Sequence, residues 1–97
     1  MIRHIVNWRA RGDDDATREE NARKIVQLLL PLRSLPEVAS LEVGVDLLGG
    51  QNWDVGLVVD FTSREEFETY RTNPDHLQVF PLLEECAGER SVVDILI

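Results

Sequence analysis

The stretch Trp53–His76, WDVGLVVDFTSREEFETYRTNPDH, changes its hydrophobic period halfway along. Over Trp53–Phe61 large apolar residues recur at every second position, which is typical of a strand. Thr62 or Ser63 can then cap a helix with its hydroxyl, and two glutamates follow where a helix N-terminus favours negative charge. The stretch therefore predicts a strand that leads directly into a helix.

The predicted helix is interrupted before it reaches the end of the stretch. Phe67 and Tyr70 lie three residues apart and so share one face. Pro74 has no N–H to donate and disfavours helical geometry in the residue before it, so the helix should break there. A second helical piece is expected over Asp75–Leu83, closed by Gly88.

The segments on either side of this stretch supply a second helix and three more strands. Apolar residues alternate in each predicted strand, and they recur at three- and four-residue steps in the helix. The predicted strands are Ile2–Arg9, Leu41–Val45 and Ser91–Ile97, and the helix starts at Asp14, Asp15 or Thr17 and ends near Leu32. The order βαββαβ predicts a ferredoxin-like α+β fold: a four-stranded antiparallel sheet with its helices on one face.

Residues 1–97 are expected to form a single domain. The chain has 43% hydrophobic and 29% charged residues, a globular balance, and it contains no repeat, low-complexity segment or linker. The net charge of −8 is the wrong sign for phosphate backbones and anionic membranes, so neither nucleic acid nor membrane is an expected partner. No apolar run is long enough to span a bilayer.

The lone cysteine, Cys86, excludes an intrachain disulfide. Its glutamate neighbours disfavour a thiolate, so we interpret it as a structural residue at a helix end. A single cysteine, together with an N-terminus that lacks a signal-like apolar run, predicts a cytoplasmic protein. Two histidines without further ligands do not predict a metal site, and no cofactor is expected.

Both faces of the predicted sheet carry large apolar side chains. In the last strand Val93 and Ile95 alternate with Val92 and Leu96, and Val58 lies on the opposite face from its apolar neighbours. A sheet face without helices should be polar, so a second copy of the chain is expected to cover it and form a homodimer. The alternative is that these side chains are tolerated on the surface.

The whole sequence resembles the stress-responsive A/B barrel (Dabb) family. The resemblance lies in MIRHIV, LPEVASLEVGVD, WDVGLVVDFTSREEFETYRTNPDH and VVDILI, in that order and at the expected spacing. It implies a ferredoxin-like subunit that pairs into a dimeric α+β barrel. Functions in this family are diverse, and some members are described only as stress-responsive.

The resemblance extends to a plant polyketide cyclase of this family, whose two histidines and one tyrosine match His4, His76 and Tyr70. It implies an enzyme in which the imidazoles act as acid and base on a β-keto substrate and the phenol orients it. The usual family turn is Tyr-x-x-His-Pro-x-His, and here Asn73 stands in place of the first histidine. The first helix also lacks a tyrosine that lines the cyclase pocket.

Two functional hypotheses remain after this comparison. The first is a binding protein that holds a small hydrophobic or aromatic ligand between sheet and helices. Its pocket is expected to contain the catalytic candidates together with Val6, Trp8, Phe67 and Asn73. The second is the cyclase-like enzyme with His4 and His76 as acid and base. A purely structural role for each histidine, bound to backbone groups, is the simplest alternative to both.

Overall fold

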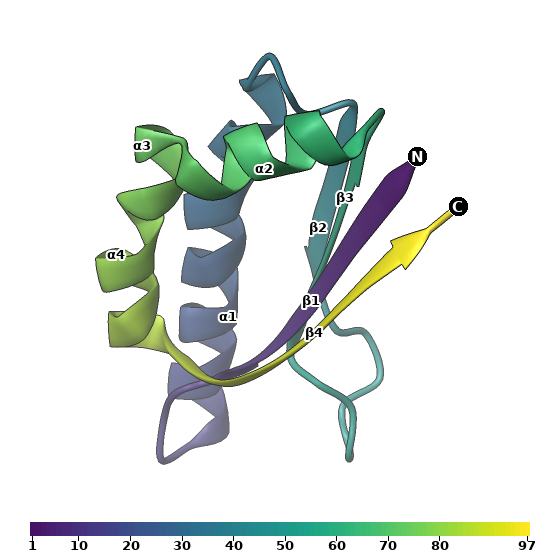
Figure 1. Ribbon diagram of the computed structural model, residues 1–97. Coiled ribbons are helices and arrows are strands. Elements are labelled where there is room, and N and C mark those ends of the chain that lie inside the picture. Colours follow the sequence, from purple (N-terminus) through teal and green to yellow (C-terminus); the bar gives the residue numbers. More distant parts are fainter.

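The computed structural model describes all 97 residues and has the predicted ferredoxin-like architecture. Its elements are β1 (Ile2–Ala10), α1 (Asp15–Leu29), η1 (Leu30–Ser34), β2 (Ser40–Val45), β3 (Val55–Phe61), α2 (Arg64–Thr72), α3 (Pro74–Leu77), α4 (Val79–Cys86) and β4 (Ala87–Leu96). The four strands form one antiparallel sheet in the order β2-β3-β1-β4. All the helices lie on one side of this sheet (Figure 1).

The hydrophobic core lies between the sheet and the helices. Ile25 and Leu29 on the inner side of α1 are buried, as are Val59 and Phe61 of β3. The apolar residues that alternate along β3 are all buried, so the strand predicted from this alternation is confirmed and its apolar side faces the core. No helix has both the length and the apolar character needed to cross a membrane.

The register of the two central pairings decides which side chains of β1 face the helices. His4 is opposite Val59 of β3 and Asp94 of β4. Since side chains alternate along a strand, Val6 and Trp8 share the helix-facing side with His4. Both are buried, as expected for the inner face of the sheet.

The first helix ends earlier than its apolar stripe predicts. Its N-cap is Asp14, whose carboxylate accepts the backbone N–H of Thr17 at 2.7 Å. The α-helix ends at Leu29, and Leu30–Ser34 form a 3₁₀ turn instead. Pro31 explains the change, because it has no N–H to continue the α-helical ladder.

The segment around Gly88 differs most from the prediction. The second helical piece consists of two helices, α3 and α4, and α4 ends at Cys86. Gly88 does not close it: β4 starts at Ala87 and includes Gly88, four residues before the expected start of the strand. A Cβ at Gly88 would lie 3.4 Å from the carbonyl oxygen of Arg9, which is an ordinary van der Waals distance, so the strand passes through this position without needing a glycine. Cys86 is a buried helix-end residue, as predicted.

The face of the sheet away from the helices carries apolar residues along its centre and one edge. Ile5 lies opposite both Val58 and Val93. On β4, Val93 and Ile95 are 51% and 40% exposed. Further along, a bidentate ion pair joins Arg3 to Asp60 at 2.8 and 2.9 Å.

Candidate functional site

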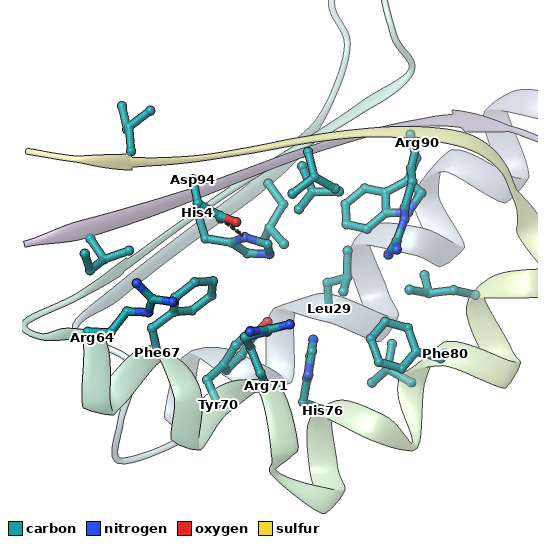
Figure 2. Close-up of a pocket in the computed structure, with 18 of the residues that line it drawn as sticks. His4, Leu29, Arg64, Phe67, Tyr70, Arg71, His76, Phe80, Arg90 and Asp94 are labelled. Carbon is teal, nitrogen blue, oxygen red and sulfur yellow. Dashed lines mark hydrogen bonds and ion pairs between the residues drawn. The ribbon is translucent and has the colours of Figure 1, made fainter.

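A cavity of about 740 Å³ opens between the sheet and helices α2 to α4 (Figure 2). Its volume is in the range of pockets that take small organic molecules. Most of its wall is apolar. The apolar and aromatic side chains that line it include Val6, Trp8, Phe67, Tyr70, Phe80 and Val92.

His4 enters this cavity from β1. Its Nδ1 lies 2.5 Å from a carboxylate oxygen of Asp94, its cross-strand neighbour on β4. A carboxylate only accepts, so Nδ1–H donates and the proton is fixed on that nitrogen. Nε2 then carries the lone pair in the neutral ring and can accept a proton. The His4 side chain is only 15% exposed and packs against Phe67 with ring centroids 5.4 Å apart.

His76 enters the same cavity from α3 on the opposite wall (Figure 2). Its ring lies between those of Tyr70 and Phe80, at centroid distances of 4.2 and 4.8 Å. Burial lowers the pKa of His76, and the charges of His4 and Arg90 lower it further. Its ring is therefore held in the neutral form more firmly than that of an exposed histidine.

The Nδ1 atom of His76 is buried and makes no hydrogen bond in the protein. The backbone carbonyls of Arg71 and Tyr70 lie close enough to favour the protonated ring in part, without reaching hydrogen-bond geometry. No hydrogen bond of standard geometry therefore holds Nδ1 of His76 to the carbonyls of its own turn.

Tyr70 links the two histidines across the cavity. Its ring centroid is 6.3 Å from that of His4 and 4.2 Å from that of His76. The residue is almost fully buried, and burial raises the pKa of its phenol, with a further contribution from the charge of Glu37. Tyr70 thus stays protonated and can donate a hydrogen bond at neutral pH.

The structure brings together six of the seven residues predicted for the site. His4, His76 and Tyr70 line the cavity with Val6, Trp8 and Phe67. Asn73 does not line it, so its assignment to the pocket was wrong. Its side chain caps α3 by accepting the N–H of Asp75 and donates to the buried carboxylate of Glu37 at 2.7 Å. Asn73 anchors the turn that carries His76 instead.

Four charged residues of the cavity were missed from the sequence. Asp94 lies on the same face of β4 as Val92, and it is the cross-strand neighbour of His4. The alternation along this strand could therefore have pointed to Asp94 as a residue of the cavity. Arg90 fell outside the predicted strand, which was started one residue too late to include it. Arg64 and Arg71 of α2 also line the cavity. Helical periodicity alone does not place these two arginines at the cavity.

The residues present do not form a cluster that could hold a metal ion. No group of three or more His, Cys, Asp or Glu side chains comes together. What the cavity offers chemically is a proton acceptor at His4, a neutral imidazole at His76 and a phenol donor at Tyr70, inside an apolar wall.

Solved structures share this fold at low sequence identity. A dimeric ferredoxin-like protein of unknown function from Bacteroides fragilis is 22% identical, with a TM-score of 0.83 over 99% of this chain and 95% of that one. A similar dimeric protein from Thermobifida fusca is 24% identical, with a TM-score of 0.82 over 99% and 90% of the two chains. The hydroxynitrile lyase of Passiflora edulis is 19% identical, with a TM-score of 0.79 over 99% and 92%.

These identities establish the fold and not the activity. None of the curated proteins matches the sequence significantly. The family model described as the stress responsive A/B barrel domain, Dabb, matches residues 2–97, which is nearly the whole chain. The chain therefore belongs to the stress responsive A/B barrel (Dabb) family.

Proposed function

We propose that this protein binds a small hydrophobic or aromatic molecule in the cavity between the sheet and helices α2 to α4. The observation that carries the proposal is the convergence of His4, Tyr70 and His76 from three elements on one largely apolar cavity of about 740 Å³. The apolar wall supplies affinity and the few polar groups orient the ligand. The buried, unpaired Nδ1 of His76 also supports a polar ligand or water nearby.

Binding can be followed through a tryptophan of the cavity wall. Trp8 lines the cavity and Trp53 does not, so Trp53→Phe leaves a single tryptophan at the site. We expect a panel of small phenols, aromatic acids and β-keto acids to contain compounds that change Trp8 fluorescence saturably. The same compounds should raise the unfolding midpoint of the wild type by several degrees, because a ligand that binds only the folded state stabilises it.

Variants of the histidines separate a binding role from a structural one. If His4→Ala and His76→Ala unfold several degrees below the wild type and no compound shifts the wild type, the histidines are structural and the proposal fails. If the variants keep their stability and lose the ligand-induced shift, the histidines serve the ligand.

A cyclase-like enzyme is the second candidate, and the His4–Asp94 hydrogen bond favours it. An imidazole whose tautomer is fixed by a carboxylate can remove the acidic proton between two carbonyls of a β-keto chain. Tyr70 or the neutral imidazole of His76 would polarise the carbonyl that the resulting carbanion attacks, and the protonated His4 would return its proton to the alkoxide that forms. Consumption of a β-keto substrate that is lost in both His4→Ala and His76→Ala would support this candidate. Turnover unchanged in both variants would exclude it.

We also propose that the protein is a homodimer. The apolar residues on the helix-free face of the sheet and the dimeric relatives from Bacteroides fragilis and Thermobifida fusca support this assembly. In a dimer the second sheet would cover Ile5, Val58 and Val93, and the ligand cavities would remain on the opposite, helix-covered sides.

A further inference from the structure

We infer that the cavity takes a singly charged carboxylic acid whose carboxylate binds Arg90 and whose apolar body extends along β1 and β4 towards His4. This inference rests on the proposed binding function and specifies its ligand. The charges of the cavity wall and the order of side chains along the two strands support it.

The cavity wall carries more positive than negative charge, although the protein as a whole is acidic. Arg64, Arg71 and Arg90 line it, and Asp94 is the only carboxylate that does. The net charge of the chain is −8, so the positive charge of the cavity wall differs in sign from the average charge of the protein. At physiological ionic strength the Debye length is about 8 Å, so acidic residues far from the cavity contribute little there. Glu68, which pairs with Arg64 and Arg71, offsets one of these two charges and leaves the site with a positive balance.

Arg90 is the arginine of this wall without an acidic partner. Arg64 and Arg71 both pair with Glu68, at 3.2 Å each. Asp94 is engaged by His4. Arg90 takes part in none of the ion pairs of the protein and points into the cavity from β4 (Figure 2). A single unpaired guanidinium matches the charge and the planar shape of one carboxylate.

The pairing of β1 with β4 sets out three rungs along the cavity floor. They are His4 with Asp94, Val6 with Val92, and Trp8 with Arg90. The first rung is an acid–base pair, the second is apolar, and the third combines an aromatic ring with a cation. Rungs two residues apart are separated by about 7 Å, so the two ends lie about 13 Å apart between Cα atoms.

This arrangement selects an elongated acid with an apolar middle. A carboxylate at Arg90 places an aromatic or alkyl body beside Val6 and Val92, and the far end of the molecule reaches the imidazole of His4. A short acid such as benzoate would reach only the Arg90 end. The cavity should therefore prefer 4-butylbenzoate to benzoate, and 4-butylbenzoate to its uncharged amide.

The experiment compares 4-butylbenzoate with 4-butylbenzamide by calorimetric titration of the wild type, Arg90→Met and Arg23→Met. Methionine keeps the apolar stem of Arg90, and Arg90 is exposed, so the fold should be retained. Arg23 is exposed on α1 and outside the cavity, so its variant changes the net charge equally. For the wild type and for Arg23→Met, we expect the acid to bind at least about tenfold more tightly than the amide, which is the gain typical of a charged hydrogen bond. For Arg90→Met, we expect the acid and the amide to bind with the same affinity.

The other outcomes separate this inference from the function on which it rests. If the acid and the amide bind the wild type equally, the carboxylate assignment is wrong while the apolar pocket stands. If the preference for the acid persists in Arg90→Met, or is lost equally in Arg23→Met, Arg90 is not its anchor. If neither compound binds any of the proteins, the proposed binding function itself fails.

Discussion

Among single residues, His76 is the one in the cavity whose surroundings lower a pKa that ordinarily lies near neutrality. Its ring is packed between Tyr70 and Phe80, and both its burial and the positive groups near it lower its pKa. A histidine that is harder to protonate in the folded than in the unfolded state stabilises the fold where it is neutral. That stabilisation is complete above the unfolded pKa and is lost as the pH falls below it towards the folded pKa.

We predict that His76→Gln makes the stability of the protein less dependent on pH. Between about pH 7.5 and about pH 5.5 the unfolded wild type takes up more protons than the folded wild type at this position, so its free energy of unfolding should fall. Glutamine does not titrate, and all other groups are common to both proteins. Urea unfolding at several pH values measures the two slopes. Parallel pH profiles would show that His76 titrates like an unfolded-state histidine.

Among the elements, the break between α2 and α3 positions the helical residues that line the cavity, Tyr70 before it and His76 after it. Asn73 precedes Pro74 and has the extended backbone expected there, with ψ of 128°. Its amide caps the next helix and binds Glu37, which is 6% exposed. The turn is thereby tied to the segment after η1, and His76 is directed into the cavity.

We predict that Asn73→Ala destabilises the protein by about 1–3 kcal/mol, because the buried carboxylate of Glu37 loses its donor. Asn21→Ala is a matched control: its amide donates to the carbonyl of Arg11 at an exposed site, so its loss should have a clearly smaller effect. Chemical denaturation measures both. Equal losses of stability would mean that the Asn73–Glu37 hydrogen bond adds nothing beyond an exposed one.

The boundaries of the elements show how much of the fold could be predicted from the sequence. Periodicity sufficed for the order of the elements along the chain and for putting His4, Val6 and Trp8 on one face of their strand, because alternation is a local property. The end of α1 was misplaced because the stripe of apolar residues continues through Leu32 beyond the proline that stops the α-helix. Gly88 resembled a helix stop, whereas it lies inside β4, because α4 already ends at Cys86.

The charges of the cavity depend on contacts that no local pattern contains. The pairing of Asp94 with His4 joins residues 90 positions apart, so the alternation along β4 reveals it only once the strand register is known. That Arg90 lacks a partner is likewise visible only when the partners of Arg64 and Arg71 are known. The sequence therefore predicted the histidines and the tyrosine of the site, but not the groups that determine their electrostatic surroundings.

In the whole molecule, the two proposed functions of the sheet lie on opposite sides: ligand binding on one side and dimerisation on the other. The helix-covered side contains the cavity, and the opposite side presents apolar residues to solvent in the single chain. Val93 lies on the edge strand β4 of this exposed side, beside Ile5, which in turn neighbours Val58. Burying these side chains against a second sheet would remove apolar surface from water without disturbing the ligand site.

We predict that Val93→Asp converts a dimer into a folded monomer. Val93 is 51% exposed in the single chain, so aspartate is tolerated there, whereas two aspartates in an apolar interface would be desolvated without partners. Light scattering on the eluting peak should give about twice the chain mass of 11.1 kDa for the wild type and a single chain mass for the variant.

Leu77→Asp serves as the control for this change, because Leu77 is 47% exposed on α3, on the helical side of the molecule. It should remain dimeric at micromolar concentration, and circular dichroism should report the same fold for all three proteins. A monomeric wild type would contradict the dimer outright. A dimer that survives Val93→Asp would contradict an interface on this part of the helix-free face, since an interface that covers Val93 would have to bury both new carboxylates.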